Sequence, residues 1–469
     1  MLFNSLEFIL FLPPVFYLYW LLRRSVRIQN LFIVACSYLF YGWWDWRFLL
    51  LIAFTTLCSY GSALLMEKKE SFRRVFCTVN IIVNLGILFL FKYYDFFVEG
   101  FESLMSVLGL KAHPATLSLI LPVGISFYTL QAIGYTIDVY RRQIPAARDI
   151  GAFFAFLSFF PQLVAGPIER ASRLYPQFLK KRIFDEQLAI SGCRLILWGF
   201  FKKIVIADGT AEIVNAVFGD IAGYNITALW LTALLFAFQI YGDFSGYSDI
   251  AIGTARLFGI RLMKNFDAPY FSKSIPEFWK RWHISLNTWF RDYLYIPLGG
   301  SRCSHGKHIR NILVVFLVSG LWHGAEWTFI AWGLYHALFF LPRVWLGKNF
   351  MESARSSWLS VVVTFVIVIL GWILFRADSI SEAFGFYQGM LGGNQAAGLM
   401  GFPLKRALKY LLAIGVMMTV EYLYTFHRTR FSFLHQPSFR VLRWASYLLC
   451  ALWILLSYEV EQSFIYFQF

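Results

Sequence analysis

The sequence predicts an all-α integral membrane protein, and composition, recurring apolar segments and the placement of basic residues all support this class. The 469 residues are 58% hydrophobic and 20% aromatic, and only 15% are charged. Soluble globular domains carry about 25% charged residues. In a bilayer the outer surface must be apolar as well as the core, which lowers the charged share. We therefore expect one polytopic membrane domain over residues 1–469.

Apolar segments long enough to cross a bilayer recur along the whole chain. They predict about 11 transmembrane helices, since a crossing needs about 20 apolar residues and tilt allows some variation. The segment at 153–167 contains Pro161, Gly166 and Pro167 and is flanked by basic clusters, so we expect it to be re-entrant. The predicted apolar segments are 6–22, 31–44, 47–66, a segment that ends near 98, and 117–139, 188–206, 227–259, 309–321, 327–346, 358–375, 404–423 and 441–456.

The net charge of +15 is distributed in short clusters between apolar segments. Cytoplasmic loops of membrane proteins carry such an excess of Lys and Arg. The clusters at 23–27, 67–74 and 141–142 fall on the same side of the predicted crossings, which places the N-terminus outside the cytoplasm. The 17 Trp and 25 Tyr fit aromatic belts at the membrane interfaces. These patterns disfavour a nucleic-acid partner and favour contact with membrane lipid.

Two carboxylates stand in the predicted apolar segment 227–259, where charge is costly. Asp243 and Asp249 would each cost at least about 2.5 kcal/mol at mid-bilayer depth without a partner. We favour a structural role, with the carboxylates bound to loop backbone or Arg, over a cavity-lining role. Gly242 and Gly246 form a small-xxx-small pair that allows close helix packing. Ser245 is a weak nucleophile candidate because its surroundings do not match the G-x-S-x-G pattern.

A basic and aromatic stretch at 278–300 predicts an interfacial helix on the cytoplasmic side. Helical spacing would place Trp279 and His283 on one face, with Asn287 one turn beyond the histidine. Membrane anchoring explains most of this stretch. It does not explain the two polar side chains of His283 and Asn287 among the aromatic residues.

His323, in SGLWHGAEW, follows an apolar run and is the strongest candidate for catalysis. A lone histidine on an apolar face is more often a packing residue, but an ionisable group inside a membrane segment points to function. A neutral imidazole can take a proton from a hydroxyl group and return it to a leaving group. His336 would lie about 20 Å away on one continuous helix, so it shares a site with His323 only if the chain breaks, for example near Gly324. His283 is the better partner candidate.

The six cysteines are scattered and show no disulfide pattern. Cys303, His305 and His308 have ligand-like spacing, but a basic surface loop explains them better than a metal site does. We expect no bound metal.

The order and spacing of several motifs resemble the membrane-bound O-acyltransferase superfamily, in particular its bacterial alginate O-acetyltransferase type. The motifs are LPVGISFYTLQAIGYTIDVYR (121–141), FFPQLVAGPIER (159–170), YGDFSGYSDIAIG (241–253), EFWKRWHISLNTWFRDYLYIPLGG (277–300), SGLWHGAEWTFIAWGLYHAL (319–338) and FIYFQF (464–469). Before residue 121 the likeness is one of apolar pattern and length alone.

The resemblance implies that His323 is the essential histidine of the superfamily and that His283 is the second catalytic position. It also implies helices around a central funnel, a cytoplasmic acyl donor, and a separate exported protein of the SGNH esterase type that completes transfer to sugar hydroxyls. We expect acetyl-CoA as the donor substrate, no permanently bound cofactor, and a polysaccharide acceptor outside the bacterial inner membrane. The expected supporting or tunnel-lining residues are Asn287, Trp322, His336, Asp243, Asp249, Arg291 and Asp292, and the expected donor-binding rim is Lys280 and Arg281.

The sequence leaves three alternatives open. His323 could act as a general base, or it could carry the acyl group briefly as a nucleophile. The group transferred could be D-alanine from an acyl carrier protein instead of acetyl. A transporter or flippase for an anionic or acylated compound would also explain basic cytoplasmic loops and intramembrane carboxylates.

Overall fold

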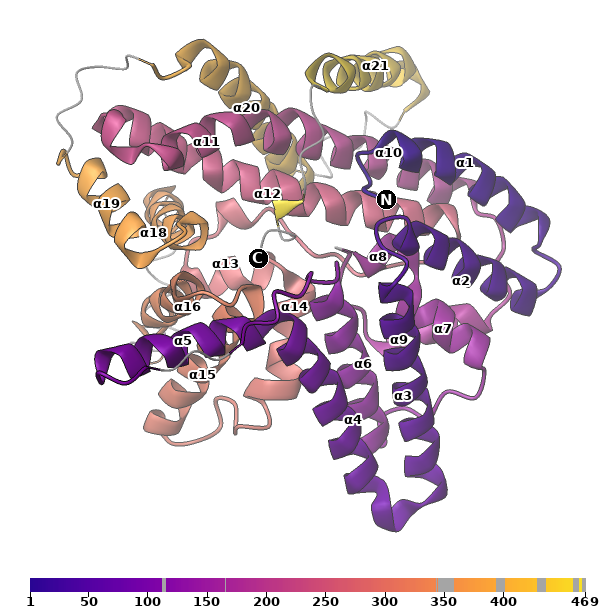
Figure 1. Cartoon of the computed structure of the whole chain (residues 1–469). Helices are drawn as coiled ribbons and strands as arrows, with labels where there is room; N and C mark the ends of the chain where they lie inside the picture. The colour runs from indigo at the N-terminus through magenta and orange to yellow at the C-terminus, as the bar shows by residue number, and fades with distance from the viewer. Residues whose placement is uncertain are drawn as a thin grey trace. The chain divides into compact units, whose positions relative to one another are not determined.

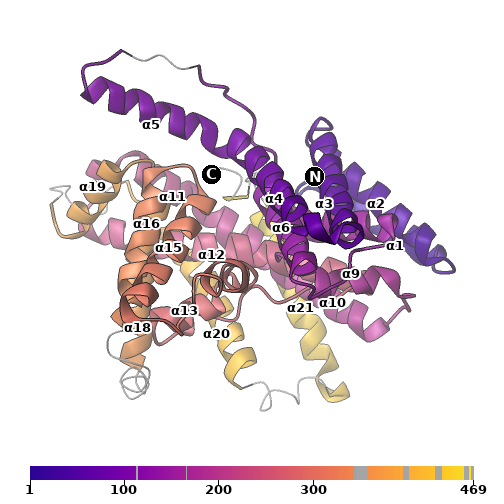
Figure 2. The same cartoon turned by 90° about the horizontal axis from the view of Figure 1, so that it is seen from below.

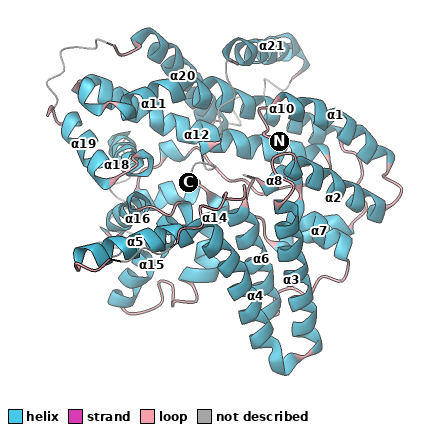
Figure 3. Ribbon diagram, in the orientation of Figure 1, coloured by secondary structure: helices cyan, strands magenta, loops and turns pink. Residues whose placement is uncertain are grey.

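The computed structural model describes residues 1–111, 115–164, 166–342, 344, 358–393, 401–427, 436–458 and 464–465. These residues form helices joined by loops, with no strand among them (Figure 3), so the predicted all-α class is confirmed. Some predicted features lie partly outside the described residues: residue 165 of the segment 153–167 and of the motif 159–170, the end of the apolar segment 327–346, and the last four residues of FIYFQF.

Six helical stretches within the described part of the chain are long and apolar enough to cross a membrane. They are Phe48–Lys68, Glu70–Val107, Ile226–Leu257, Trp358–Arg376, Leu404–Phe426 and Arg440–Ser457. Our prediction of about 11 crossings also counted shorter apolar helices, such as Leu6–Leu21. The exact number of crossings therefore stays a prediction.

The chain forms two compact units, each assembled from separate segments. Unit 1 comprises Met1–Cys193, Ala251–Met263 and Gly324–Glu326, and unit 2 comprises Arg194–Ile250, Lys264–His323 and Trp327–Phe469. Helices α10 (Glu186–Phe200) and α12 (Ile226–Leu257) each contribute residues to both units. Because neither unit is one continuous stretch of chain, the expectation of a single domain stays a prediction.

In unit 1, helices α3, α4 and α6 lie side by side (Figure 1). Several helix starts carry side-chain caps, as at α7, where Asp149 accepts a hydrogen bond from the backbone N–H of Ala152 at 2.8 Å. The helices of unit 1 are α1 (Leu6–Leu21), α2 (Val26–Gly42), α3 (Phe48–Lys68), α4 (Arg73–Leu88), α5 (Tyr94–Val107), α6 (Ile125–Tyr140), α7 (Ile150–Ser158), α8 (Phe160–Leu163) and α9 (Ala171–Leu179).

The expected interruption within 153–167 is present. Helix α7 ends at Ser158, Phe159 leaves the helical region with ψ 108°, and α8 begins at Phe160. The backbone N–H of Phe160 at the break donates to the hydroxyl of Ser37 at 3.1 Å, so this buried group is satisfied. Such a break survives only where protein surrounds it. Whether the segment is re-entrant in a membrane stays a prediction.

Unit 2 contains a helical hairpin whose first helix ends at His323. Helix α15 (His305–His323) packs against α16 (Trp327–Phe340), which in turn packs against α18 (Trp358–Arg376; Figure 2). Gly320 and Gly333 make the close approach of α15 and α16 possible, because a Cβ atom on either would collide with a backbone carbonyl of the opposite helix. The other elements of unit 2 are η3 (Phe201–Asp208), α11 (Gly209–Gly219), α13 (Ile275–Arg281), α14 (Ile284–Phe290), η6 (Arg291–Tyr295), α19 (Ile380–Met390), α20 (Leu404–Phe426) and α21 (Arg440–Ser457).

The prediction of one continuous interfacial helix over 278–300 is wrong. The chain forms the two short helices α13 and α14, and Trp282 and His283 separate them. His283 has φ +45°, a left-handed conformation that a continuous helix excludes. Trp279 and His283 are buried, so the prediction from helical spacing, which placed both on a surface helix, is wrong.

Candidate active site

His323 is the last residue of α15 and is almost completely buried, with 3% of its surface exposed. Its ring lies among aromatic side chains: the ring centroids are 4.9 Å from Trp322, 5.1 Å from Trp332 and 5.4 Å from Phe375. The predicted supporting residue Trp322 thus contacts the histidine directly. An ionisable group in such apolar surroundings is a candidate functional site.

His283 lies close to His323, although 40 residues separate them in sequence. The centroids of the two imidazole rings are 6.5 Å apart, and His283 is 1% exposed. The structure therefore brings together the two histidines that the sequence paired. Their catalytic roles stay predictions.

Asn265, on the loop before α13, orients His283. The Asn265 Oδ1 atom lies 3.1 Å from His283 Nδ1 and accepts hydrogen bonds from both the backbone N–H and the hydroxyl of Ser285, at 3.2 and 2.9 Å. The Asn265 amide nitrogen donates to Ser248 at 3.2 Å. Because Oδ1 is an acceptor, it favours the tautomer of His283 with hydrogen on Nδ1 and a lone pair on Nε2. An imidazole in this state can accept a proton.

His283 is neutral as well as oriented. It occupies the break between α13 and α14, outside the six helices long enough to span a membrane. Burial lowers the pKa of His283 to about 3, because desolvation disfavours the charged ring.

Asn287, the other polar residue predicted near the site, has a structural role. Its side-chain amide donates to the carbonyl oxygens of Trp279 at 2.7 Å and Trp282 at 2.5 Å. It thereby satisfies carbonyl groups at the end of α13, which have no partner inside the helix. Asn287 stabilises the break on which His283 lies.

The buried carboxylate of Asp243 belongs to an ion-pair network. Lys203 Nζ lies 2.7 Å from both Asp243 and Asp208, and Asp243 accepts a hydrogen bond from the backbone N–H of Ile465 at 2.6 Å. The prediction that this carboxylate binds loop backbone is confirmed. The prediction named Arg as the alternative partner, and the cation that pairs with Asp243 is a lysine. Phe464, next to Ile465, packs on Phe244, which in turn contacts His283.

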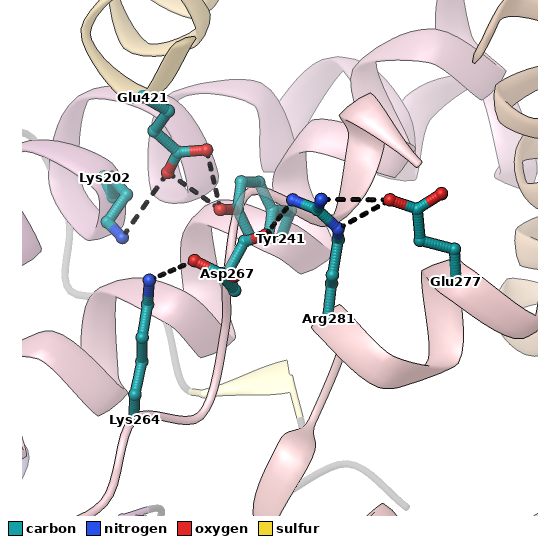
Figure 4. A network of polar contacts seen from close by, with 7 residues as sticks. All are labelled: Lys202, Tyr241, Lys264, Asp267, Glu277, Arg281 and Glu421. Atoms are coloured by element: carbon teal, nitrogen blue, oxygen red, sulfur yellow. Dashed lines mark hydrogen bonds and ion pairs between the residues drawn. The ribbon is translucent and has the colours of Figure 1, made fainter. Parts of the chain in front are cut away.

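Asp249 pairs with the neighbouring lysine. Lys202 Nζ lies 2.5 Å from Asp249. It also lies 4.0 Å from Glu421, to which the hydroxyl of Tyr241 donates at 2.8 Å (Figure 4). Both lysines belong to η3, a π-helical turn, and such turns occur often at functional sites.

The predicted glycine pair on α12 also packs closely. A Cβ atom on Gly242 would lie 2.8 Å from the carbonyl oxygen of Lys202, and one on Gly246 would lie 2.8 Å from that of Gly199. The glycines bring α12 against the segment that carries the lysines, so close packing and charge pairing occur together.

Arg281, one of the two basic residues predicted to bind the donor, has an acidic neighbour. The Arg281 guanidinium lies 2.9 Å from the carboxylate of Glu277 and donates to the carbonyl oxygen of Asp267 at 3.2 Å, while Lys264 pairs with the Asp267 side chain (Figure 4). Lys280 is exposed. The predicted Arg291 and Asp292 pair with each other at 2.7 Å.

His336 lies close to His323 because the chain does break between the two histidines. Residues 324–326 form a turn between α15 and α16. We had expected the two histidines to share a site only if the chain broke near Gly324. The ring centroids of His323 and His336 lie 5.1 and 5.0 Å from that of Trp332, so both histidines contact one indole. His336 therefore belongs to the same aromatic cluster as His323.

Sequence reasoning missed Lys202, Lys203, Glu421 and Asn265. The first three stand inside predicted apolar segments, so the cost of intramembrane charge that singled out Asp243 could have identified them too. Asn265 gives no such signal. Its role depends on a loop folding back on His283, which no sequence spacing predicts.

A buried imidazole pair and a neighbouring ion-pair network in an all-helical membrane protein suit proton transfer during group transfer. Residues 147–378 match the model of MBOAT, the membrane-bound O-acyltransferase family. The chain is 41% identical over 396 residues to the "probable alginate O-acetylase" of Pseudomonas aeruginosa, which covers 83% of this chain and 75% of the relative. It is 36% identical over 432 residues to the peptidoglycan O-acetyltransferase of Helicobacter pylori, covering 84% and 80%.

A third relative is more distant. The teichoic acid D-alanyltransferase of Bacillus subtilis is 29% identical over 333 residues, which is 66% of this chain and 79% of the relative. Taken together, these matches show that the chain belongs to the membrane-bound O-acyltransferase family. It is a membrane-embedded, multi-pass O-acyltransferase.

Proposed function

We propose that this O-acyltransferase passes acetyl groups from acetyl-CoA, on the cytoplasmic side of the bacterial inner membrane, to an extracytoplasmic polysaccharide. The observation that carries the proposal is the buried pair His283 and His323, with ring centroids 6.5 Å apart. Relatives named for O-acetylation of alginate and peptidoglycan support acetyl as the group and a glycan as the acceptor. The N-terminus lies outside the cytoplasm in this proposal, because the basic clusters then face inward.

In the proposed reaction His323 is the general base. It takes the proton from an acceptor hydroxyl while the hydroxyl oxygen attacks the carbonyl carbon of the acetyl thioester. The carbon–sulfur bond then breaks, the thiolate leaves, and the proton passes from His323 to the sulfur. His283, held neutral with a lone pair on Nε2, accepts a hydrogen bond from a second donor group of the acceptor molecule and so orients it, while the single hydroxyl proton goes to His323. An exported protein of the SGNH type completes transfer to the sugar.

Replacement of His323 tests the proposal. We expect His323→Ala to reduce polysaccharide O-acetylation to background, measured as O-acetyl content at matched levels of the protein in the membrane. His305→Ala is the matched control, because His305 is an exposed histidine at the start of α15. Acetylation by His323→Ala at the level of the control would exclude the catalytic role and favour a transporter or flippase.

Two further measurements separate the remaining alternatives. Rapid quenching under single-turnover conditions should trap no acyl-histidine if His323 is a base; a trapped adduct would make it a nucleophile. Membranes supplied with acetyl-CoA or with a D-alanyl carrier protein identify the donor. The relative named for D-alanyl transfer is the reason for the second donor, and transfer of D-alanine alone would contradict the acetyl proposal.

A further inference from the structure

Three buried aromatic side chains beside the site carry polar atoms that the proposed reaction does not use. The centroids of the Trp279 and Trp332 rings are 5.5 Å apart, and the His336 ring lies 5.0 Å from each of them. Trp279, Trp332 and His336 come from α13 and α16 and are 7%, 0% and 0% exposed. We call these residues the indole cluster.

The polar atoms of the indole cluster have no hydrogen-bond partner among the described residues. These atoms are the two indole nitrogens and both ring nitrogens of His336. A buried donor or acceptor without a partner costs about 1–3 kcal/mol. Several such atoms in one cluster need an explanation, and a ligand that binds there supplies one.

A neighbouring buried tryptophan, Trp372, is satisfied. Trp372 contacts Trp332 and is equally buried, at 1% exposed, yet its N–H donates to the hydroxyl of Tyr270 at 3.2 Å. Burial of an indole in this core is therefore compatible with a hydrogen bond. The indole cluster differs from Trp372 in this respect.

The indole cluster also contacts the proposed base. Trp332 touches His323 edge to face, with ring centroids 5.1 Å apart. On the other side of the cluster, a Cβ atom on Gly371 would lie 2.8 Å from His336 Nε2, so the glycine allows the imidazole to sit against α18. The position of His336 is thus determined by backbone packing.

Acyl transfer from a thioester needs donors beside its base. When the acceptor oxygen attacks, the π electrons of the carbonyl group move onto its oxygen, and preorganised N–H groups stabilise that charge. We propose that the indole cluster is the subsite for the carbonyl oxygen of the acyl group, with the N–H groups of Trp279 and Trp332 and one of His336 as its donors. This inference rests on the proposed function of His323.

The test compares two donors that differ in the basicity of the developing oxyanion. Fluoroacetyl-CoA gives a less basic oxyanion than acetyl-CoA, so the loss of an N–H donor should slow the reaction of fluoroacetyl-CoA by a smaller factor. Trp332→Phe and Trp279→Phe keep an aromatic ring and remove only the N–H, and His336→Phe removes the ring nitrogens. CoA release is measured under single-turnover conditions in inverted membrane vesicles that contain the full-length protein and are prepared from cells that also make the acceptor polysaccharide and the exported partner.

We expect each of these three variants to lose about 10²–10³-fold in rate with acetyl-CoA, as removal of an oxyanion donor does, and measurably less with fluoroacetyl-CoA. Trp372→Phe is the matched control and should slow both donors by the same factor. The inference would be overturned if the variants lost equal rate with the two donors, or if their losses were no larger than those of Trp372→Phe. The ring nitrogens would then be explained by bound water or by weak N–H···π contacts.

His323→Ala in the same vesicles separates the two proposals. If it abolishes CoA release while the indole variants behave like Trp372→Phe, the subsite is wrong and the proposed base stands. If His323→Ala releases CoA at the normal rate, or wild-type vesicles release none from acetyl-CoA, the proposed function fails and the subsite fails with it.

Discussion

Units 1 and 2 bury polar groups in different ways. In unit 1 the interior of α3, α4 and α6 contains neutral groups: Asn80 accepts from Thr136 at 2.9 Å and from the Asn84 amide at 3.1 Å, and its own amide lies 3.4 Å from the hydroxyl of Ser59. In unit 2, which also holds the histidine pair, the buried Lys203 pairs with the buried Asp243, and the buried Lys202 pairs with the half-buried Asp249.

Arg182 shows how unit 1 satisfies a buried charge with neutral groups. Arg182 is 6% exposed and donates hydrogen bonds to neutral acceptors, among them Gln29 at 3.2 Å and Asn30 at 2.8 Å. Neutral partners satisfy a buried group without creating a titratable site, whereas charge pairs and histidines can exchange protons. We therefore expect unit 1, apart from the titratable group of Glu169, to act as a scaffold and unit 2 to carry the chemistry, and the following predictions test this expectation.

The largest effect is expected at Lys203. Lys203→Met removes the ammonium group that faces Asp208 and Asp243, and breaking a buried ion pair costs about 3–5 kcal/mol. Folded protein in the membrane should fall severalfold, as measured by detergent extraction and size-exclusion chromatography. Lys181→Met, at an exposed lysine, is the control.

A second variant separates charge from packing at Lys203. Adding Asp243→Asn to Lys203→Met removes one of the stranded carboxylates and should restore part of the folded protein. If the double variant folds no better than Lys203→Met, the network is not stabilised by charge pairing.

The next effect is on rate and concerns the orientation of His283. Asn265→Ala removes the acceptor 3.1 Å from His283 Nδ1. We expect kcat to fall about 10–100-fold with little change in KM, as for other supporting hydrogen bonds to functional histidines. Asn265→Asp keeps an acceptor oxygen and should recover most of the rate.

Asn225 offers a matched control for Asn265 within unit 2. It accepts a hydrogen bond from the backbone N–H of Ala228 at the start of α12, at 3.0 Å. Asn225→Ala should therefore change stability and leave kcat near wild type. Equal rates for Asn225→Ala and Asn265→Ala would show that Asn265 does not orient His283.

In unit 1 the expected effect is on stability and not on rate. Asn80→Leu keeps a similar volume and leaves the hydroxyl groups of Ser59 and Thr136 without that partner, at a cost of about 1–3 kcal/mol. The midpoint of thermal unfolding should drop, while the rate per folded molecule stays constant. Thr78→Val, at an exposed position of α4, is the control. A selective loss of kcat in Asn80→Leu would contradict the scaffold role of unit 1.

The smallest effect depends on pH. Glu169, in the loop after α8, is buried, and desolvation raises its pKa from 4.5 to about 7. The folded state binds more protons than the unfolded state between these values, so Glu169 lowers stability as pH rises from 4.5 to 7.

Glu169→Gln removes this dependence and keeps an oxygen that can accept from the backbone N–H of Met263. The unfolding midpoint of the variant relative to wild type should therefore rise between pH 5 and pH 8. A constant difference across that range would mean that Glu169 does not titrate there in the folded protein.

The sequence by itself determined the all-helical membrane class, because the apolar surface that a bilayer requires raises the share of apolar residues in the composition. It also identified His323 and His283, since ionisable groups in apolar runs are costly. The buried partners of Asp243 and Asp249 were accessible to the same argument, although we predicted the wrong type of cation.

Only the tertiary structure decided how these residues meet. The left-handed backbone at His283 breaks a stretch that looks continuous by helical spacing, and it turns Trp279 and His283 inward. The hairpin after His323 brings His336 to the same indole ring. Asn265 reaches His283 through a loop. Local periodicity cannot report such contacts, because they depend on how distant segments pack and on where the backbone leaves the helix.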